Sequence, residues 1–182
     1  MTTLATVITG ASSGIGEALA HLFAPEQQTL VLVARRKERL DALAKELNSK
    51  YGIKVHVITQ DLQEIGAAAN LMNSISNLNL TVDTLVNNAG FGISAPFAKS
   101  DGAKTSAMMQ LNMVALTELT HMALPAMLER RHGRIMNIAS VVAFQACPYF
   151  AVYAATKAYV LSFTEALAAE VSDRGILVTA VC

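Results

Sequence analysis

A tyrosine and a lysine, Tyr153 and Lys157, stand four residues apart in a segment with helical periodicity. Residues four apart lie on the same face of a helix, so the two side chains can meet. The phenol of a free tyrosine has a pKa of about 10, too high for efficient proton transfer at neutral pH, and a nearby ammonium favours the phenolate. The pair could therefore serve as a general acid and base. The spacing alone is weak evidence, because any long helix can carry it by chance.

A glycine-rich turn, TGASSGIG, occupies residues 9–16, between an apolar run and a helical pattern. Glycines allow tight curvature and the close approach of a phosphate, and the start of a helix offers free N–H groups and a positive dipole end. The spacing is G-x-x-x-G-x-G rather than the commoner G-x-G-x-x-G, and an ordinary glycine turn is the alternative. The turn predicts a site for a nucleotide pyrophosphate, with these candidate residues: Gly10, Ser12, Ser13, Gly14, Ile15 and Gly16.

Two arginines, Arg35 and Arg36, end the second apolar run. In dinucleotide-binding folds, an acidic residue about 20 residues after the glycines binds the adenosine ribose hydroxyls of NAD. A guanidinium instead pairs with phosphate, and NADP carries a phosphate on that ribose. We therefore predict NADP as the cofactor. The alternative is that the arginines only begin a solvated helix, although a helix N-terminus disfavours cations.

Apolar runs and helical patterns alternate along the whole chain, and these elements must position the residues above. Strands are expected over 4–9, 28–34, 55–58, 82–87, 134–139 and 176–181, and helices over 14–24, 37–50, 63–76, 100–131 and 149–172. Pro125 should kink or divide the long helix. Strands that are apolar throughout predict an α/β fold, a doubly wound parallel sheet of Rossmann type in the order 3-2-1-4-5-6. Without any internal linker, residues 1–182 should form one domain.

Taken together, these motifs resemble those of the classical short-chain dehydrogenase/reductase family. The other matching pieces are Asp61-Leu62 after the third strand, Asn87-Asn88-Ala89-Gly90 after the fourth, Asn112 in the long helix, Ser140 after the fifth, and the full Tyr153-Ala154-Ala155-Thr156-Lys157. They occur in the family's order and cover essentially the whole chain. Within the family, the sequence is most similar to bacterial DltE-type oxidoreductases.

The resemblance implies an oxidoreductase that transfers a hydride between NADP(H) and a carbonyl or alcohol substrate, through a Ser-Tyr-Lys-Asn proton relay. Tyr153 would exchange a proton with the substrate oxygen, and Ser140 would hydrogen-bond the same oxygen. Lys157 would favour the phenolate and bind the nicotinamide ribose, and Asn112 would hold a water that extends the relay.

The cofactor's adenine would lie at Asp61 and Leu62, according to the same resemblance. Asn88, Ala89 and Gly90 would line the cofactor site, with Ala89 and Gly90 leaving it room, and Asn87 would tie the central strands together. The family also implies a homodimer or homotetramer, formed through the two long helices around a two-fold axis.

The C-terminal end departs from the family pattern. In the family, a Pro-Gly turn, a segment that covers the nicotinamide and the substrate, and a seventh strand follow the sixth strand, whereas this sequence reaches Cys182 at the edge of that turn. We expect the seventh strand and the substrate-closing segment to be missing, and little turnover without them. The alternative functions are a nucleotide-binding fragment or pseudoenzyme, and a structural partner that reuses the fold.

Composition argues against several other classes. The 14 Lys and Arg residues balance 14 Asp and Glu residues, which is unlike a nucleic-acid binder. The mean hydropathy is high at +0.39, yet no stretch reaches the roughly 18 apolar residues of a membrane span, and the N-terminus lacks signal-peptide features. Two cysteines and four histidines form no metal-binding spacing, so we expect no metal and a cytoplasmic location.

Overall fold

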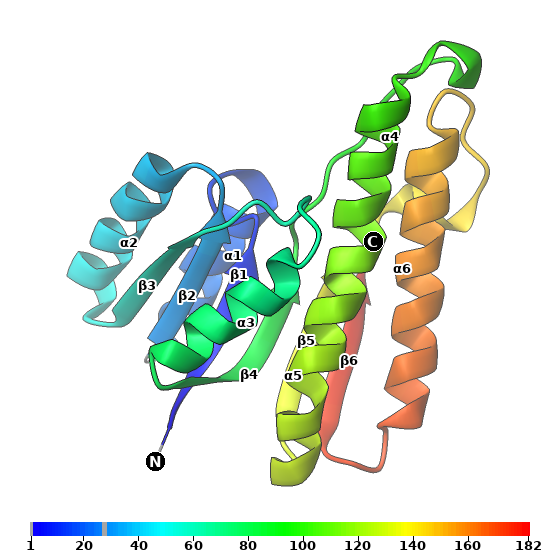
Figure 1. Ribbon diagram of the computed structural model, residues 1–182. Coiled ribbons are helices and arrows are strands. Elements are labelled where there is room, and N and C mark those ends of the chain that lie inside the picture. The colour runs from blue at the N-terminus through cyan, green and yellow to red at the C-terminus, as the bar shows by residue number, and fades with distance from the viewer. Residues whose placement is uncertain (1, 27–28) are drawn as a thin grey trace.

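A six-stranded parallel sheet forms the centre of the computed structural model, which describes residues 2–26 and 29–182 (Figure 1). The strands lie in the order β3-β2-β1-β4-β5-β6. They are β1 (Thr3–Thr9), β2 (Thr29–Ala34), β3 (Lys54–Thr59), β4 (Leu80–Asn87), β5 (Gly133–Ile138) and β6 (Ile176–Val181). The predicted fold class and strand order are confirmed. Gln28, which was expected to open the second strand, lies outside the described residues.

Helices cover both faces of this sheet. On one face lie α1 (Gly14–Phe23) and α2 (Lys37–Tyr51). On the other, turned toward the viewer in Figure 1, lie α3 (Ala67–Asn77), α5 (Leu116–Arg130) and α6 (Ala151–Glu170). α4 (Gly102–Met109) continues the line of α5 beyond the edge of the sheet. The short helices are η1 (Phe97–Lys99), the π-helical η2 (Gln110–Ala115) and η3 (Val141–Phe144).

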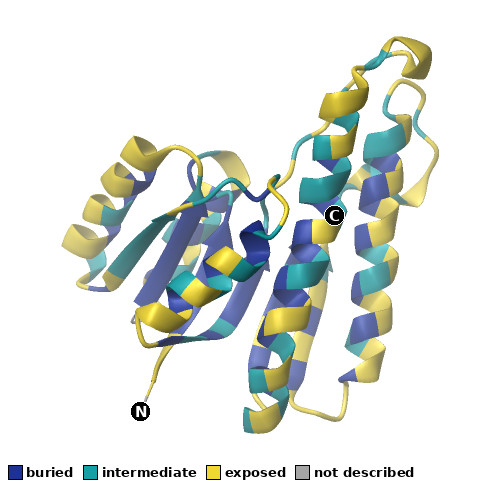
Figure 2. Ribbon diagram, in the orientation of Figure 1, coloured by how far each residue is buried: buried dark blue, intermediate teal, exposed yellow. Residues whose placement is uncertain are grey.

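The apolar runs form strands because both sides of each central strand are buried. In β2, Val31 and Val33 pack into the core beneath α3 and α5, whereas Leu30 and Leu32 pack into the core beneath α1 and α2. Successive side chains of a strand point to opposite faces, so a strand between two helical layers needs apolar residues at every position. Figure 2 shows the result, with the central strands buried along their length.

The third helix begins later than its periodicity predicts, at Ala67 rather than at residue 63. The carboxylate of Asp61 accepts a hydrogen bond from the N–H of Gln63 at 3.0 Å, which holds the chain in a turn. Gly66 then adopts a left-handed conformation with φ of 79°. This turn keeps Asp61 and Leu62 at the sheet edge.

The long helix is undivided at Pro125, which corrects the prediction that the proline divides it, while a kink there stays a prediction. α5 runs through Pro125 without interruption. Pro125 and His121 both lie on the exposed side of the helix, where water can reach the His121 carbonyl that the proline leaves without an N–H partner. The irregular part is instead η2, and it carries Asn112.

The chain reverses its direction of winding between β1 and β4. From β1 it passes through α1 to β2 on one side, and the second half of the chain returns to β4 on the other side. A crevice opens beyond the carboxyl ends of the strands at such a switch point. The loops after β1, β2, β4 and β5 meet at this edge of the sheet.

Candidate active site

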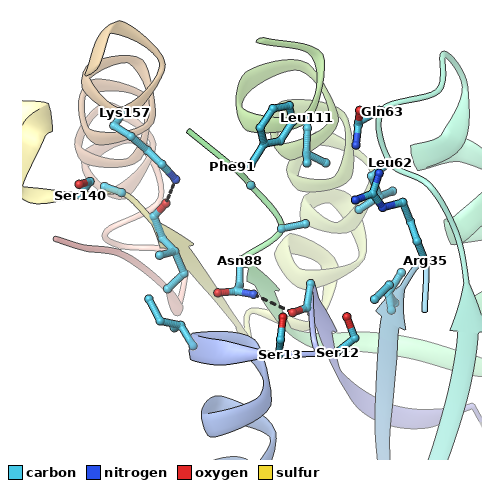
Figure 3. A pocket seen from close by; sticks show the side chains of 18 of the residues that line it. Ser12, Ser13, Arg35, Leu62, Gln63, Asn88, Phe91, Leu111, Ser140 and Lys157 are labelled. Carbon is cyan, nitrogen blue, oxygen red and sulfur yellow. Dashed lines mark hydrogen bonds between the residues drawn. The ribbon is translucent and has the colours of Figure 1, made fainter. Parts of the chain in front are cut away.

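A cleft of about 590 Å³ lies along this edge of the sheet (Figure 3). Most of the residues singled out in the sequence line it: Gly10, Ser12, Ser13, Ile15, Arg35, Arg36, Asp61, Leu62, Asn88, Ala89, Gly90, Ser140, Tyr153 and Lys157. Three others, Gly14, Gly16 and Asn112, do not. The cleft therefore places the glycine turn and the Tyr-Lys pair, far apart in the sequence, in one continuous site.

The glycine turn fits closely against the end of β4. A Cβ atom on Gly10, whose φ is 68°, would lie 2.7 Å from Asn88 Nδ2 and 2.9 Å from Ala89 Cα. Gly16 lies outside the cleft lining, and a Cβ on it would clash with the Gly10 carbonyl oxygen and with Asn88 Nδ2. Asn88 Nδ2 donates to the Thr9 carbonyl oxygen at 2.8 Å. Only glycine can occupy positions 10 and 16 in this arrangement.

A single hydroxyl joins the two loops at the switch point. Thr9 Oγ1 donates to the Val86 carbonyl oxygen at 3.1 Å and accepts from the backbone N–H groups of Asn88 and Ala89, each at 3.0 Å. Thr9 is buried. The glycine turn after β1 and the loop after β4 therefore hold a fixed position relative to each other.

The first turn of α1 is open to a ligand. Ser13, the N-cap residue, makes no side-chain hydrogen bond to the first turn, and Gly14 and Ile15 are exposed. The first N–H groups of a helix have no partner within the helix, and together with the helix dipole they bind anions. Gly14, with φ of 59°, supports this turn from outside the cleft lining.

The two arginines have different surroundings. Arg36 Nη2 donates to Ser13 Oγ at 2.6 Å and to Ser12 Oγ at 2.9 Å, so its guanidinium lies against the glycine turn. Arg35 instead extends toward Leu62, as Figure 3 shows, and its Nη1 lies 3.5 Å from Asp61 Oδ2. The Arg35–Asp61 pair is partly exposed, and surface pairs of this kind contribute little stability.

Lys157 is buried at the opposite end of the cleft. Its Nζ donates to the Ile138 carbonyl oxygen at 2.6 Å, so α6 is fastened to the end of β5 (Figure 3). Burial lowers the pKa of Lys157 to about 8, because desolvation penalises the ammonium. Lys157 Nζ lies 5.9 Å from the centre of the half-buried Tyr153 ring, and Ser140 follows β5 on the same side.

Asn112 lies behind the cleft, in the π-helical turn. Its Nδ2 donates to the Phe91 carbonyl oxygen at 3.0 Å and to Thr156 Oγ1 at 3.1 Å, and its Oδ1 accepts from the Phe91 N–H at 3.1 Å. Both amide hydrogens are thus used, which leaves one lone pair of Oδ1 for a water. A Cβ on Gly90 would lie 3.0 Å from that oxygen and 3.6 Å from Lys157 Nζ.

A buried polar network beneath the cleft was only partly expected. Asn87 Nδ2 donates to Asn137 Oδ1 at 2.9 Å and to Thr120 Oγ1 at 3.0 Å, and Asn137 Nδ2 donates to Thr164 Oγ1 at 3.0 Å. The network connects β4 and β5 to α5 and α6. The sequence signal for Asn137 is a polar residue inside the apolar run of the fifth strand.

Several lining residues were not singled out in the sequence. They are Val33, Ala34, Gln60, Gln63, Phe91, Leu111, Ile138, Ala139, Val141, Val181 and Cys182. Most of them follow a strand end or one of the motifs above directly, which is a usable signal, whereas Leu111 lies in the π-helical turn, which no motif indicates. The described residues contain no group of three or more His, Cys, Asp or Glu side chains placed to hold a metal ion. In the described part of the chain, no helix combines the length and apolarity needed to cross a membrane.

Comparisons with known proteins agree with this geometry. The ketoacyl reductase HetN of Nostoc sp. is 34% identical over 185 residues, covering 100% of this chain and 64% of the relative. Among solved structures, the bulky-bulky ketone specific alcohol dehydrogenase from Comamonas testosteroni has a TM-score of 0.90 at 35% identity, covering 100% of this chain and 72% of that one. A short-chain dehydrogenase from Sphingobium yanoikuyae in complex with NADPH has a TM-score of 0.90 at 37% identity, covering 98% and 69%.

The chain spans between 52% and 71% of the length of such curated relatives. The finer likeness to DltE-type oxidoreductases stays a prediction. The sequence pattern of the family described as short chain dehydrogenase matches residues 5–182. That match covers nearly the whole chain, and together with the relatives above it shows that the chain belongs to the short-chain dehydrogenase family.

Proposed function

We propose that the protein transfers a hydride between NADP(H) and a carbonyl or alcohol substrate. The observation that carries this proposal is the cleft itself, which has an anion-binding helix start at one end and the group Ser140, Tyr153 and Lys157 at the other. Family membership supports an oxidoreductase, and the roles of the individual residues are part of the proposal.

The residues present fit a dinucleotide. Gly10 and the open first turn of α1 would hold the pyrophosphate, and Asp61 and Leu62 would lie at the adenine. Arg36, with Ser12 and Ser13, offers several hydrogen-bond donors to a phosphate on the adenosine ribose. This arrangement favours NADP over NAD. In the same direction, the Sphingobium yanoikuyae relative is in complex with NADPH, and a metagenomic relative is in complex with NADP.

The residues at the catalytic end of the cleft would transfer the proton to or from the substrate oxygen. When bound, the nicotinamide supplies or accepts the hydride. Tyr153 gives a proton to the substrate oxygen during reduction, and Ser140 hydrogen-bonds the same oxygen. Lys157, held by the Ile138 carbonyl, favours the phenolate of Tyr153 and binds the nicotinamide ribose. Asn112 fixes the Phe91 backbone, and its remaining lone pair can hold a relay water.

The segments around Tyr153 favour an uncharged substrate. Residues 88–98 and 138–156 contain no Asp, Glu, Lys or Arg. They carry several exposed apolar side chains, namely Phe97, Val141, Phe144 and Tyr149. Apart from Lys157, which is already held by the Ile138 carbonyl, these segments offer no cation to an anionic group, whereas an apolar substituent would find surface to cover. We propose a carbonyl with a sizeable apolar substituent as the substrate class.

Replacement of Tyr153 by Phe tests the proposed function, because only the transferable proton is lost. In any form of the protein that is long enough to turn over, we expect kcat for NADPH-dependent reduction of an aromatic ketone to fall by about 10²–10⁴-fold. The Kd for NADPH, measured by fluorescence titration, should stay nearly unchanged. Tyr159→Phe, in the same helix, is the matched control. A Tyr153→Phe variant that keeps the wild-type kcat would contradict the proton-donor role.

We also propose a homodimer or homotetramer that forms through α5 and α6. Near or on these helices, Val114, Met122 and Tyr159 are each 39% exposed, which leaves apolar surface beyond what the sheet covers. A two-fold axis would place the same patch of both copies in contact. A monomer in light scattering at micromolar concentration would contradict this proposal.

We also propose the cytoplasm as the compartment, because Cys147 and Cys182 are free and disulfides are rare there.

A further inference from the structure

We infer that Gly92 is a positioning residue, which sets the direction of the Tyr153 phenol because it has no side chain. The inference rests on the proposed function, in which Tyr153 exchanges a proton with the substrate. Gly92 lies in the loop after β4, two residues beyond Gly90, and it does not line the cleft. No motif of the sequence singles it out.

The contact with the ring is direct. A Cβ atom on Gly92 would lie 3.1 Å from Cδ2, 3.2 Å from Cγ and 3.3 Å from Cε2 of Tyr153. Carbon atoms in contact prefer about 3.5–4.0 Å, so the ring or the loop would have to move by a few tenths of an ångström. The φ of Gly92 lies outside the left-handed region, so the backbone itself does not require glycine. The space beside the ring is what requires it.

The loop that carries Gly92 is fixed on both sides. Phe91 exchanges two hydrogen bonds with Asn112, which is only 2% exposed and is itself bonded to Thr156. Three residues beyond Gly92, the Ala95 N–H donates to the Tyr149 carbonyl oxygen at 2.9 Å. A loop held at both ends yields less readily than a side chain that turns about single bonds. An added methyl group should therefore displace the ring.

Displacement of the ring changes the reacting geometry. Tyr153 has Phe150 as an aromatic neighbour, with ring centres 6.1 Å apart, and Lys157 Nζ lies 5.9 Å from the centre of the Tyr153 ring. The phenol oxygen is at the far end of the ring, so a tilt at Cγ and Cδ2 moves it relative to Lys157 and Ser140. Because a 1 Å misplacement can cost about 10²-fold in rate, a few tenths of an ångström should be measurable.

The variant Gly92→Ala tests this inference, with Gly102→Ala as the matched control. A Cβ on Gly102 would meet nothing within 4 Å, and Gly102 also has no left-handed φ. In Gly92→Ala we expect kcat to fall by about 3- to 30-fold, with the NADPH Kd and the Tm unchanged. NMR of the chain with ring-labelled tyrosine gives a readout independent of turnover. Of the four tyrosine signals, the one lost in Tyr153→Phe should shift, while those of Tyr51 and Tyr159 stay in place.

The outcomes separate the inference from the proposed function. An unshifted Tyr153 signal overturns the inference, and so does a loss of NADPH affinity or of Tm that accompanies the loss of kcat. If Tyr153→Phe keeps the wild-type kcat, the proposed function fails, and the NMR signal alone decides whether Gly92 sets the ring position. If Gly92→Ala does not fold, the double variant Gly92→Ala/Tyr153→Ala replaces it, because the ring that the added Cβ would meet is then absent. A double variant that also fails to fold, while Tyr153→Ala alone folds, overturns the inference.

Discussion

The adenosine end and the catalytic end of the cleft are built in opposite ways. At the adenosine end, Arg35 and Asp61 project from loops with 64% and 33% of their side chains exposed. At the catalytic end, Lys157 and Asn112 stand on helices with 6% and 2% exposed, and each is hydrogen-bonded to the backbone of another element. Recognition of the cofactor thus uses adjustable surface groups, whereas the proposed chemistry uses groups whose positions are fixed by folding.

The largest effect of a substitution is expected at the catalytic end of the cleft, where the side chains are buried. Lys157→Met should lower kcat by about 10²–10⁴-fold, because the proposed acid–base pair loses its cation. The same change should raise the free energy of unfolding at pH 7 by about 1–3 kcal/mol, since it removes a buried charge. Urea unfolding and steady-state kinetics measure the two effects. Lys45→Met, at an exposed position, is the control.

The stability difference between wild type and Lys157→Met should depend on pH. Burial lowers the pKa of Lys157 from 10.5 in the unfolded chain to about 8 in the folded one. Below pH 8 both states hold the proton, so the folded state carries the full cost of the buried ammonium. Between pH 8 and 10.5 the folded state loses its proton first, so wild-type stability rises relative to the variant and the difference shrinks. A constant difference between pH 7 and pH 10 would contradict a buried charge.

At the exposed end, the two arginines should differ in their effect on cofactor affinity. Arg36→Ala should weaken NADPH binding by about 10–150-fold, because a charge-assisted hydrogen bond contributes about 1.5–3 kcal/mol. NADH binding should change little. Arg35→Ala should weaken NADPH binding by at most about fivefold, as expected for an exposed pair. Fluorescence titration with both cofactors measures this, and equal losses in the two variants would remove the distinction between them.

The smallest effect on function is expected beneath the cleft. Thr164→Val keeps the shape of the side chain but leaves Asn137 Nδ2 without its acceptor, which should lower the free energy of unfolding by about 1–3 kcal/mol. NADPH affinity should stay the same, because Thr164 does not line the cleft. Thr117→Val, near the surface of the same helical layer, is the control. An unchanged stability of Thr164→Val would show that water replaces the lost acceptor.

The features that follow from local sequence were predictable, and those that depend on distant side chains were not. The apolar run of β2 indicated a strand with two buried faces, and TGASSGIG indicated a turn against a helix start. By contrast, the different partners of Arg35 and Arg36 depend on Ser13 and Asp61, which are distant in the sequence. The contact of Gly92 with Tyr153 also joins residues about sixty positions apart, so no local pattern indicates it.

The errors in the predicted helices have local causes that hydrophobic periodicity does not reveal. Periodicity placed the start of the third helix at residue 63, because it cannot register the hydrogen bond from the Gln63 N–H to the Asp61 carboxylate. It likewise gave no sign of the π-helical turn at Asn112, since one extra residue in a turn disturbs a 3.6-residue pattern very little. The prediction that Pro125 divides the long helix was wrong, because solvent can satisfy the carbonyl that the proline leaves free.

The Thr9 hydroxyl has a consequence for how a nucleotide enters. Its three hydrogen bonds join the loop after β1 to the end of β4, where the two halves of the doubly wound sheet meet. A hinge at that joint would have to break all three bonds, one of which is buried and two of which are partly buried, and each lost bond is costly. The two halves of the sheet should therefore move as one rigid body. The cofactor should enter through motion of the surface loops and not through a hinge between the two halves.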